Sequence, residues 1–178
     1  MRLLPEALEI TSGAVSVGNQ DLFELSESNM QTVRGRRVAM ICQNAMTALN
    51  PVQTVGQQVA ETLRLHTDLR GSALRNRVVQ LFNEVGIPDS EQRFDFYPHE
   101  LSGGQQQRVM IAMALACEPE VLIADEPTTA LDVTIQEQVL KLIRELTESR
   151  KLAVLLITHD MGVVRNTADE VAVMYRGE

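Results

Sequence analysis

The sequence predicts an α/β domain built on a parallel sheet, with a helical insert in the middle of the chain. Short apolar runs of strand length, such as residues 38–42 and 121–124, alternate with longer stretches in which apolar residues recur every three or four positions. This alternation is typical of parallel sheets covered by helices. Several of the apolar runs also end on polar side chains, and the strand ends are where open α/β sheets place their chemistry.

Length, composition and charge predict one globular domain. The chain has 178 residues, 44% of them hydrophobic, and a formal net charge of −8. The negative charge disfavours general attraction to nucleic acid, so we expect no nucleic-acid partner. No run reaches the ~18 apolar residues of a membrane span, and residues 1–10 make a poor secretion signal. Cys42 and Cys117 show no spacing motif, which indicates a reducing compartment, and we expect both to be buried. These features together predict a soluble cytoplasmic domain.

The first part of the chain predicts short elements. Residues 1–4 look like the end of a helix stopped by a proline, and residues 13–17 alternate like a short strand before a Gly-Asn turn. A serine can cap a short helix over residues 26–31. Residues 38–42 are continuously apolar, as in a strand buried on both faces, and this strand ends at Gln43.

A helical subdomain is expected over about residues 44–117, inside an α/β core made of residues 1–43 and 118–178. Two sets of apolar residues in this insert recur at helical spacing: Val52, Val55, Val59 and Leu63, then Leu74, Val78, Leu81 and Val85. A polar connector separates them. We interpret His66 and His99 as surface or packing residues, and Met110 and Met113 as core residues.

The last part of the chain returns to the core pattern. Residues 134–150 predict a long amphipathic helix with Val139, Leu142, Ile143 and Leu146 facing inward. Residues 152–157 form another fully apolar run, which predicts a buried strand. A short helix follows, and residues 171–175 predict a last strand.

The chemistry concentrates in residues 101–132. Ser102 can cap the helix that follows, while Gly103 and Gly104 let the backbone approach another group closely. Free amides and the helix dipole would then make an anion site before Gln105. Taken alone, a double glycine is as compatible with an ordinary turn. The apolar strand and paired acids some twenty residues later make the pattern much more specific.

Two neighbouring carboxylates, Asp125 and Glu126, end the strand after this helix. On an extended chain they point to opposite sides, so one can hold a divalent cation while the other accepts a proton from water. General-base help of this type is worth about 10²–10⁴ in rate. His159 and Gln43 also end apolar strands, and parallel strands would bring them to the same edge of the sheet. A solvated strand end and a structural histidine are the alternatives.

Five segments together resemble the ATP-binding subunits of ABC transporters. Residues 101–105 (LSGGQ) resemble the family signature, 121–127 (VLIADEP) the Walker B strand and 129–132 (TALD) the D-loop. Residues 157–160 (ITHD) resemble the histidine switch, and Gln43 the Q-loop glutamine. The resemblance covers essentially the whole chain. It implies a P-loop NTPase-like (RecA-like) core with a helical ABC subdomain.

Three longer strings resemble the importer branch for dipeptides, oligopeptides, nickel and glutathione: residues 46–58, 97–104 and 125–136. The resemblance implies ATP and Mg²⁺ as cofactors, peptides as the cargo, and ATP-driven dimer closure as the power stroke. Implied partners are transmembrane permease subunits, a second ATP-binding subunit and, indirectly, a substrate-binding protein. The implied location is the cytoplasmic face of the inner membrane.

The resemblance assigns roles by motif. Asp125 would orient Mg²⁺ through its water shell, and Gln43 would contact the metal and sense the γ-phosphate. Glu126 would polarise the attacking water, and His159 would hold the γ-phosphate.

The remaining roles lie at the partner subunit. Ser102, Gly103 and Gly104, with Gln105 of the same signature, would grip the γ-phosphate of ATP bound on the opposing subunit. Asp132 would bridge the two nucleotide sites. The helical insert would dock on the permease subunits.

One departure accompanies these matches. The family also has a phosphate loop, GxxxxGK followed by Ser or Thr, and the 178 residues contain none. We therefore expect an N-terminally truncated chain that cannot hydrolyse ATP alone, because the positive half of the phosphate cradle is missing. The alternative is a non-hydrolysing subunit that lends LSGGQ to a complete partner. We also expect unpaired apolar strand edges and poor solubility of the isolated chain.

Overall fold

A three-stranded parallel sheet forms the centre of the molecule. The computed structural model describes residues 1, 10–43, 45–129 and 131–176. The strand order is β3 (Val38–Ile41), β4 (Val121–Asp125) and β5 (Ala153–Ile157). β4 is the middle strand, with Ile41 opposite Ala124 on one side and Asp125 opposite Ile157 on the other. The predicted α/β fold with a parallel sheet is confirmed.

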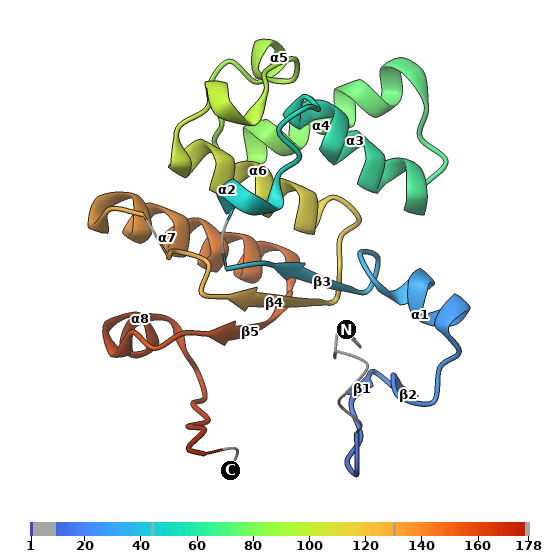
Figure 1. Ribbon diagram of the computed structural model, residues 1–178, viewed down its shortest axis with the longest axis vertical. Coiled ribbons are helices and arrows are strands. Elements are labelled where there is room, and N and C mark those ends of the chain that lie inside the picture. Colours follow the sequence, from blue (N-terminus) through green and yellow to red (C-terminus); the bar gives the residue numbers. More distant parts are fainter. Residues whose placement is uncertain (2–9, 44, 130, 177–178) are drawn as a thin grey trace.

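Two different layers cover the faces of the sheet. On one face, Ala39, Ile41 and Leu122 join the main core together with side chains of α6 (Gly103–Leu115) and α7 (Val133–Arg150). On the other face, Val38, Val121 and Ile123 belong to a small cluster with residues of the N-terminal segment. That segment contains the hairpin β1 (Ser16–Val17) and β2 (Gln20–Asp21) and helix α1 (Glu27–Val33), and it lies near the start of the strands (Figure 1).

The helical region, defined here as residues 45–115, lies on the side of the molecule away from β5, and α6 is its helix nearest the sheet (Figure 1). Its elements before α6 are α2 (Ala45–Ala48), α3 (Val55–His66), α4 (Gly71–Glu84), α5 (Ser90–Arg93) and a 3₁₀ turn, η1 (Pro98–Glu100). The two predicted helices are present as α3 and α4, but Val52, expected on the buried face of the first, lies before its N-cap Thr54 and is exposed. The division of the chain at about residues 44 and 117 stays a prediction.

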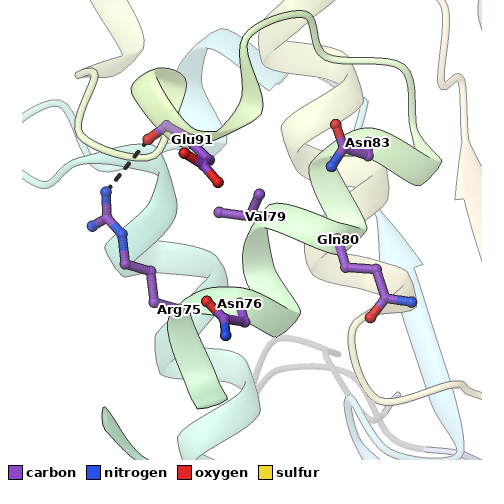
Figure 2. A pocket seen from close by; sticks show the side chains of 6 residues that line it. All are labelled: Arg75, Asn76, Val79, Gln80, Asn83 and Glu91. Atoms are coloured by element: carbon purple, nitrogen blue, oxygen red, sulfur yellow. Dashed lines mark hydrogen bonds between the residues drawn. The ribbon is translucent and has the colours of Figure 1, made fainter. Parts of the chain in front are cut away.

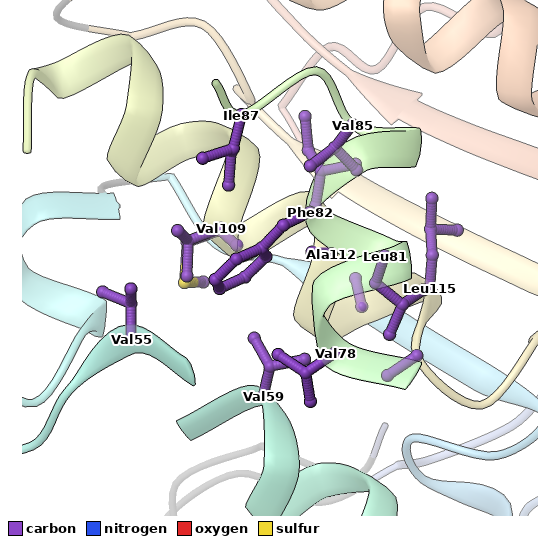
Figure 3. Close-up of a cluster of buried hydrophobic side chains, with 14 of the residues drawn as sticks. Val55, Val59, Val78, Leu81, Phe82, Val85, Ile87, Val109, Ala112 and Leu115 are labelled. Atoms are coloured by element: carbon purple, nitrogen blue, oxygen red, sulfur yellow. The ribbon is translucent and has the colours of Figure 1, made fainter. Parts of the chain in front are cut away.

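The helical region has a dense aliphatic core of its own. Phe82 is fully buried and lies among valine and leucine side chains of α3, α4 and α6 (Figure 3). The residues labelled there share one contiguous cluster: Val55, Val59, Val78, Leu81, Phe82, Val85, Ile87, Val109, Ala112 and Leu115. Because this cluster continues into Ile41, Leu122 and Val139 of the sheet layer, helices and sheet are packed on one core.

Side chains cap the N-termini of several helices, as the sequence predicts for Ser26 and Ser102. Ser26, Ser102 and Asp132 are the N-caps of α1, α6 and α7, and each side chain accepts a backbone N–H of its own first turn. The amphipathic pattern of α7 is also confirmed, because Val139, Leu142 and Ile143 are buried and Leu146 packs against the core. The expected helix end at residues 1–4 falls mainly on residues outside the described ones.

Three expectations about burial and the C-terminal segment are wrong. Ala153, Leu155 and Ile157 of β5 are exposed although the run is fully apolar, because these alternate side chains point to the face of the sheet opposite the α6 and α7 layer, which the described residues leave open at β5. Residues 171–175 form no strand and are exposed, because no described strand lies beside them to accept their backbone hydrogen bonds. Cys42 is exposed because β3 already ends at Ile41, whereas Cys117 is half-buried.

Candidate functional site

The carboxyl ends of the three parallel strands bring Gln43, Glu126 and His159 together. Gln43 follows β3, Glu126 follows β4, and His159 follows β5. The parallel register sets these ends side by side, and the backbone N–H of Glu126 donates to the carbonyl oxygen of Ile157 at 2.9 Å. We call Gln43, Asp125, Glu126 and His159 the strand-end site.

Glu126 is the centre of the strand-end site. Its Oε1 lies 2.7 Å from Nδ1 of His159, and its Oε2 accepts from Nε2 of Gln43 at 2.9 Å and from Oγ1 of Thr129 at 2.8 Å. An ionised carboxylate only accepts hydrogen bonds, so the proton of the His159 ring sits on Nδ1. Three donors from three different segments therefore fix the direction in which this carboxylate points.

The backbone and the charge of Glu126 are both unusual. Its φ is +45°, a left-handed conformation that a residue with a side chain rarely adopts. The pKa of Glu126 is lowered by the hydrogen bond with His159 first, and then by those from Thr129 and Gln43. Since the side chain of Glu126 is 21% exposed and that of His159 80% exposed, the pair opens to water on the His159 side. The arrangement can present an ionised carboxylate to a solvent molecule.

Asp125 lies one residue before Glu126, at the last position of β4. Among the described residues, no three His, Cys, Asp or Glu side chains lie close enough together to hold a metal ion by themselves. Magnesium does not need such a cage, because it prefers one or two carboxylates together with phosphate oxygens and water. The hard oxygen donors of Asp125 and Gln43, at the ends of adjacent strands, fit that chemistry.

The signature turn, defined as residues 102–105, begins α6. Ser102 Oγ accepts from the backbone N–H of Gln105 at 3.3 Å, while the Gln105 side chain accepts from the N–H of Ser102 at 3.0 Å. This capping box leaves the turn exposed or half-exposed at the N-terminus of a 13-residue helix. Its remaining N–H groups and the helix dipole favour an anion at this end.

The first turn of α7 lies between the signature turn and the strand-end site. A Cβ added to Gly104 would lie 2.8 Å from Cγ2 of Ile135, so this glycine permits close packing of α6 on α7. On its other side, Gln136 donates to the Asp160 side chain at 3.3 Å, next to His159. Asp132 begins α7 and accepts from the N–H of Ile135 at 2.9 Å. The start of α7 thus contacts the signature turn and the residue that follows His159.

Sequence reasoning missed Thr129 and Gln136. A threonine three residues after a key carboxylate, with a proline between them, is a turn signal that could have pointed to Thr129, since the Thr129 N–H also donates to the Glu126 carbonyl at 3.1 Å. Nothing in the pattern around Gln136 distinguishes it from an ordinary exposed helix position.

A hollow of the surface lies away from the strand-end site. It has a volume of about 420 Å³ and is lined by Arg75, Asn76, Val79, Gln80, Asn83 and Glu91 on α4 and α5 (Figure 2). None of the predicted site residues lines it. Within the described residues, no helix has the length and apolar character needed to cross a bilayer.

A parallel sheet with a carboxylate-centred strand-end site and a capped signature helix defines an ATP-binding cassette of the P-loop NTPase class. The sequence model of the family described as ABC transporter matches residues 1–129. The chain therefore belongs to the ABC transporter family.

Curated relatives are about half identical to the chain. It is 51% identical over 176 residues to the dipeptide transport ATP-binding protein DppD of Bacillus subtilis, covering 99% of this chain and 52% of that protein. It is 49% identical over 177 residues to the Escherichia coli protein of the same name, covering 99% and 52%. It is 52% identical over 166 residues to the oligopeptide transport ATP-binding protein OppD of B. subtilis, covering 93% and 46%. The chain spans about half the length of these curated relatives.

Solved structures agree on the fold. The dimeric ATP-binding cassette MJ0796 in a post-hydrolysis state bound to ADP and Pi aligns with a TM-score of 0.76 at 30% identity. The alignment covers 87% of this chain and 66% of that chain. The predicted RecA-like core with a helical ABC subdomain is confirmed.

Proposed function

We propose that this chain is part of the ATP-binding subunit of an ABC importer that takes up peptides or similar small solutes. The relatives named above are dipeptide and oligopeptide transport ATP-binding proteins. The proposal rests on one observation: the Glu126 carboxylate is held in one direction by hydrogen bonds with Gln43, Thr129 and His159. ATP hydrolysis needs such a group in a fixed direction, because positioning supplies much of the catalysis in phosphoryl transfer.

Glu126 and His159 carry the proposed hydrolysis step. Water attacks the γ-phosphorus and transfers its proton towards Glu126 while the bond to ADP breaks. The lowered pKa keeps Glu126 ionised at neutral pH, so it is able to accept that proton. His159, exposed at the outer side of the pair, would contact the γ-phosphate, and with Nδ1 turned to Glu126 it can donate through Nε2 only when both ring nitrogens are protonated.

Asp125 and Gln43 would hold Mg²⁺, Asp125 through water and Gln43 through its amide oxygen. The amide nitrogen of Gln43 is already engaged with Glu126, which leaves the amide oxygen as the donor atom. When bound, the ion would neutralise charge on the phosphates.

Ser102, Gly103, Gly104 and Gln105 would contact ATP held by a second ATP-binding subunit, and Asp132 would lie between the two sites. The exposed helix start supports this role, since it offers anion-binding groups. In this proposal the chain works at the cytoplasmic face of the membrane, docked on permease subunits that receive cargo from a substrate-binding protein.

ATP-dependent pairing tests the role of the signature turn. The chain is mixed with a complete ATP-binding subunit of a dipeptide importer, and co-elution is followed with and without ATP and Mg²⁺. We expect ATP-dependent co-elution that Ser102→Arg abolishes. Ser72→Arg, at an exposed position of α4, is the matched control and should leave co-elution unchanged. Equal pairing of the Ser102→Arg chain would contradict the proposal.

Hydrolysis tests Glu126 in a fusion that supplies the phosphate loop, made by joining the N-terminal segment of a dipeptide importer subunit, up to and including its GxxxxGK motif, the Ser or Thr that follows and the helix after it, in front of residue 1. The fusion is paired with the same partner subunit. Glu126→Gln keeps the size of the side chain and removes its charge, so we expect pairing to persist while hydrolysis assigned to this strand-end site falls by about 10²–10⁴. Unchanged phosphate release from a complex whose other site is inactivated would exclude Glu126 as the base.

A further inference from the structure

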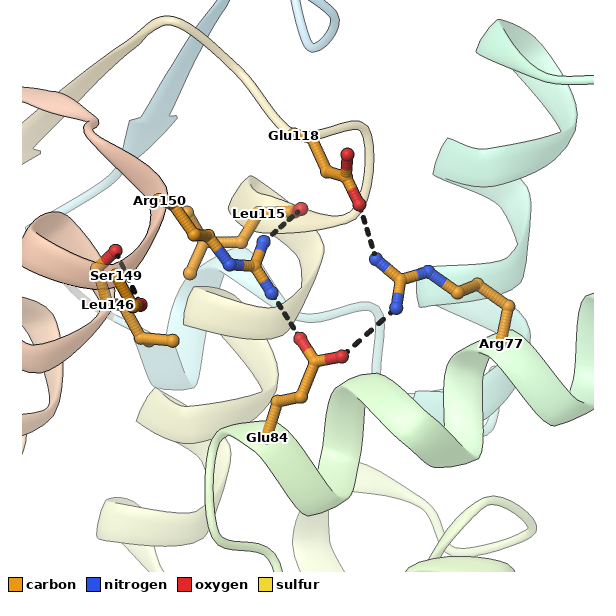
Figure 4. Close-up of polar contacts among 7 residues, drawn as sticks. All are labelled: Arg77, Glu84, Leu115, Glu118, Leu146, Ser149 and Arg150. Atoms are coloured by element: carbon orange, nitrogen blue, oxygen red, sulfur yellow. Dashed lines mark hydrogen bonds and ion pairs between the residues drawn. The ribbon is translucent and has the colours of Figure 1, made fainter.

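Four charged side chains join the helical region to the sheet layer far from the strand-end site. Glu84, at the end of α4, lies between the guanidinium groups of Arg77 and Arg150 (Figure 4). Arg77 donates to Glu84 and to Glu118 at 3.0 Å each, and Arg150 at the end of α7 pairs with the other oxygen of Glu84. We call Arg77, Glu84, Glu118 and Arg150 the Glu84 clasp.

Arg150 makes a further contact in this cluster. It also donates to the carbonyl oxygen of Leu115 at 3.2 Å, at the end of α6 where carbonyl groups have no partner within the helix. One guanidinium therefore connects the ends of α4, α6 and α7. The side chains of Arg77, Glu84 and Arg150 are 19%, 27% and 22% exposed, so these contacts are screened by solvent less than ordinary surface pairs.

The clasp and the signature turn lie at opposite ends of α6. Twelve residue steps of 1.5 Å separate Gly103 from Leu115, a lever of about 18 Å, so one degree of rotation at the clasp moves the signature turn by about 0.3 Å. At the signature end, α6 meets Ile135 of α7 and Leu131 of the segment before it, which are apolar contacts without direction. The hydrogen bond described between α6 and α7, from Arg150 to the Leu115 carbonyl oxygen, lies at the clasp end.

We propose that the Glu84 clasp is a latch at the pivot of the helical region. When it is closed, α4 and the end of α6 are held on α7, and the signature turn keeps one orientation relative to the strand-end site. Release of the clasp frees a hinge at the turn between α6 and β4, where Glu118 has a positive φ of 54°. This inference concerns the motion of the chain without nucleotide and does not depend on the proposed function.

Cys117 is a natural reporter of this hinge. It precedes Glu118, is half-buried, and its Sγ lies 3.8 Å from the carbonyl oxygen of Thr62 in α3. In a Cys42→Ser background, Cys117 is the only thiol of the 178-residue chain. The rate at which Ellman's reagent modifies it under native conditions therefore measures how often the clasp region opens.

We expect Arg150→Met and Glu84→Gln each to raise the Cys117 modification rate about tenfold, since each removes charge-assisted hydrogen bonds from a half-buried cluster. Arg144→Met is the matched control, because Arg144 lies on the same helix and its pair with Glu148 is exposed on both sides. That control should leave the rate unchanged. Glu84→Gln keeps the size of the side chain, so its Cys117 modification rate is used if Arg150→Met does not fold.

Hydrogen exchange separates a latch from general stabilisation. For a latch, the amides of α4 and the second half of α6 exchange faster in Arg150→Met, while those of β4 keep their protection. If the β4 amides accelerate as much as those of α4, the clasp only stabilises the whole fold, and the proposal is wrong. An unchanged Cys117 rate in both Arg150→Met and Glu84→Gln would also overturn it.

Discussion

The helical region and the sheet leave their apolar residues in opposite states. In the helical region, Phe82, Leu81 and Val78 are completely buried. In the sheet, Leu155 of β5 is 56% exposed and Ile157 is 45% exposed. Both segments are rich in apolar residues, at helical spacing in α4 and as a continuous run in β5, and the difference in burial comes from their neighbours. α4 packs against α3 and α6, whereas β5 is exposed at every second residue and has a strand on one side only.

Apolar residues in the sequence can therefore end up buried or exposed. In the helical region, apolar residues at helical spacing are buried by contacts within the chain itself. At β5, a similar composition forms an exposed surface, where unpaired backbone groups of the edge and aliphatic side chains lie together. The region between residues 45 and 115 should therefore carry most of the stability, while β5 should carry most of the tendency to associate.

The largest difference is expected between Phe82→Ala and Leu155→Ala. Phe82 is fully buried, so its truncation leaves a cavity and should lower the free energy of unfolding by about 3–5 kcal/mol. Leu155→Ala should change it by less than about 0.5 kcal/mol, since the side chain is already largely in water. Urea denaturation of both variants measures the difference. Comparable losses would mean that β5 is buried in solution by contacts beyond those described.

Replacing glycine by alanine should show the same difference between a packed and an open site, with smaller losses in the free energy of unfolding. A Cβ on Gly56 of α3 would lie 2.4 Å from Cγ of Phe94 and 2.5 Å from its carbonyl oxygen, so Gly56→Ala forces the backbone apart. We expect a loss of about 1–3 kcal/mol. Gly162 is the matched glycine of α8 (Met161–Thr167), where a Cβ would meet only the Asp160 side chain at 3.0 Å. Gly162→Ala should stay within about 0.5 kcal/mol of the parent in the same denaturation experiment.

Most of the fold could be predicted because the relevant signals are local. Helical spacing located α3, α4 and α7. The N-caps Ser26 and Ser102 could be identified because each is a serine directly before a helical pattern. The strand ends were also predictable, since parallel strands bring their carboxyl ends to one edge whatever the details of packing. This rule alone placed Gln43, Glu126 and His159 together.

The failures all concern properties that depend on neighbours. No feature of residues 171–175 could indicate that no described strand pairs with them, and nothing within residues 152–157 shows that one face of this strand stays open to water. The edge position of β5 itself agrees with the expectation of unpaired apolar strand edges. The Glu84 clasp was equally invisible, because it joins residues 66 positions apart, Glu84 and Arg150. The left-handed φ of Glu126 also lay beyond prediction, since it follows from the turn that ties Glu126 to Thr129.

The smallest effect we predict is a difference in how acid and salt act on the two regions. The pKa of Asp95, in the helical region, is lowered chiefly by its hydrogen bond from the Arg75 guanidinium, and the pKa of Glu126 chiefly by its hydrogen bond with His159. A carboxylate with a lowered folded-state pKa contributes stability above its unfolded pKa and loses that contribution as pH falls through the folded value. Unfolding free energy should therefore decrease below about pH 4.5, and Asp95→Asn and Glu126→Gln should each flatten that decrease.

Salt should then separate the two carboxylates. The Asp95–Arg75 pair is exposed on both sides, at 64% and 44%, so its attraction is strongly screened. Glu126 also accepts hydrogen bonds from the neutral groups of Thr129 and Gln43, whose contribution depends less on ionic strength. In urea titrations between pH 3 and 6, about 0.5 M NaCl should remove most of the Asp95→Asn difference and leave more of the Glu126→Gln difference. Equal salt sensitivity would mean that His159 alone, as a charged partner, holds the Glu126 carboxylate.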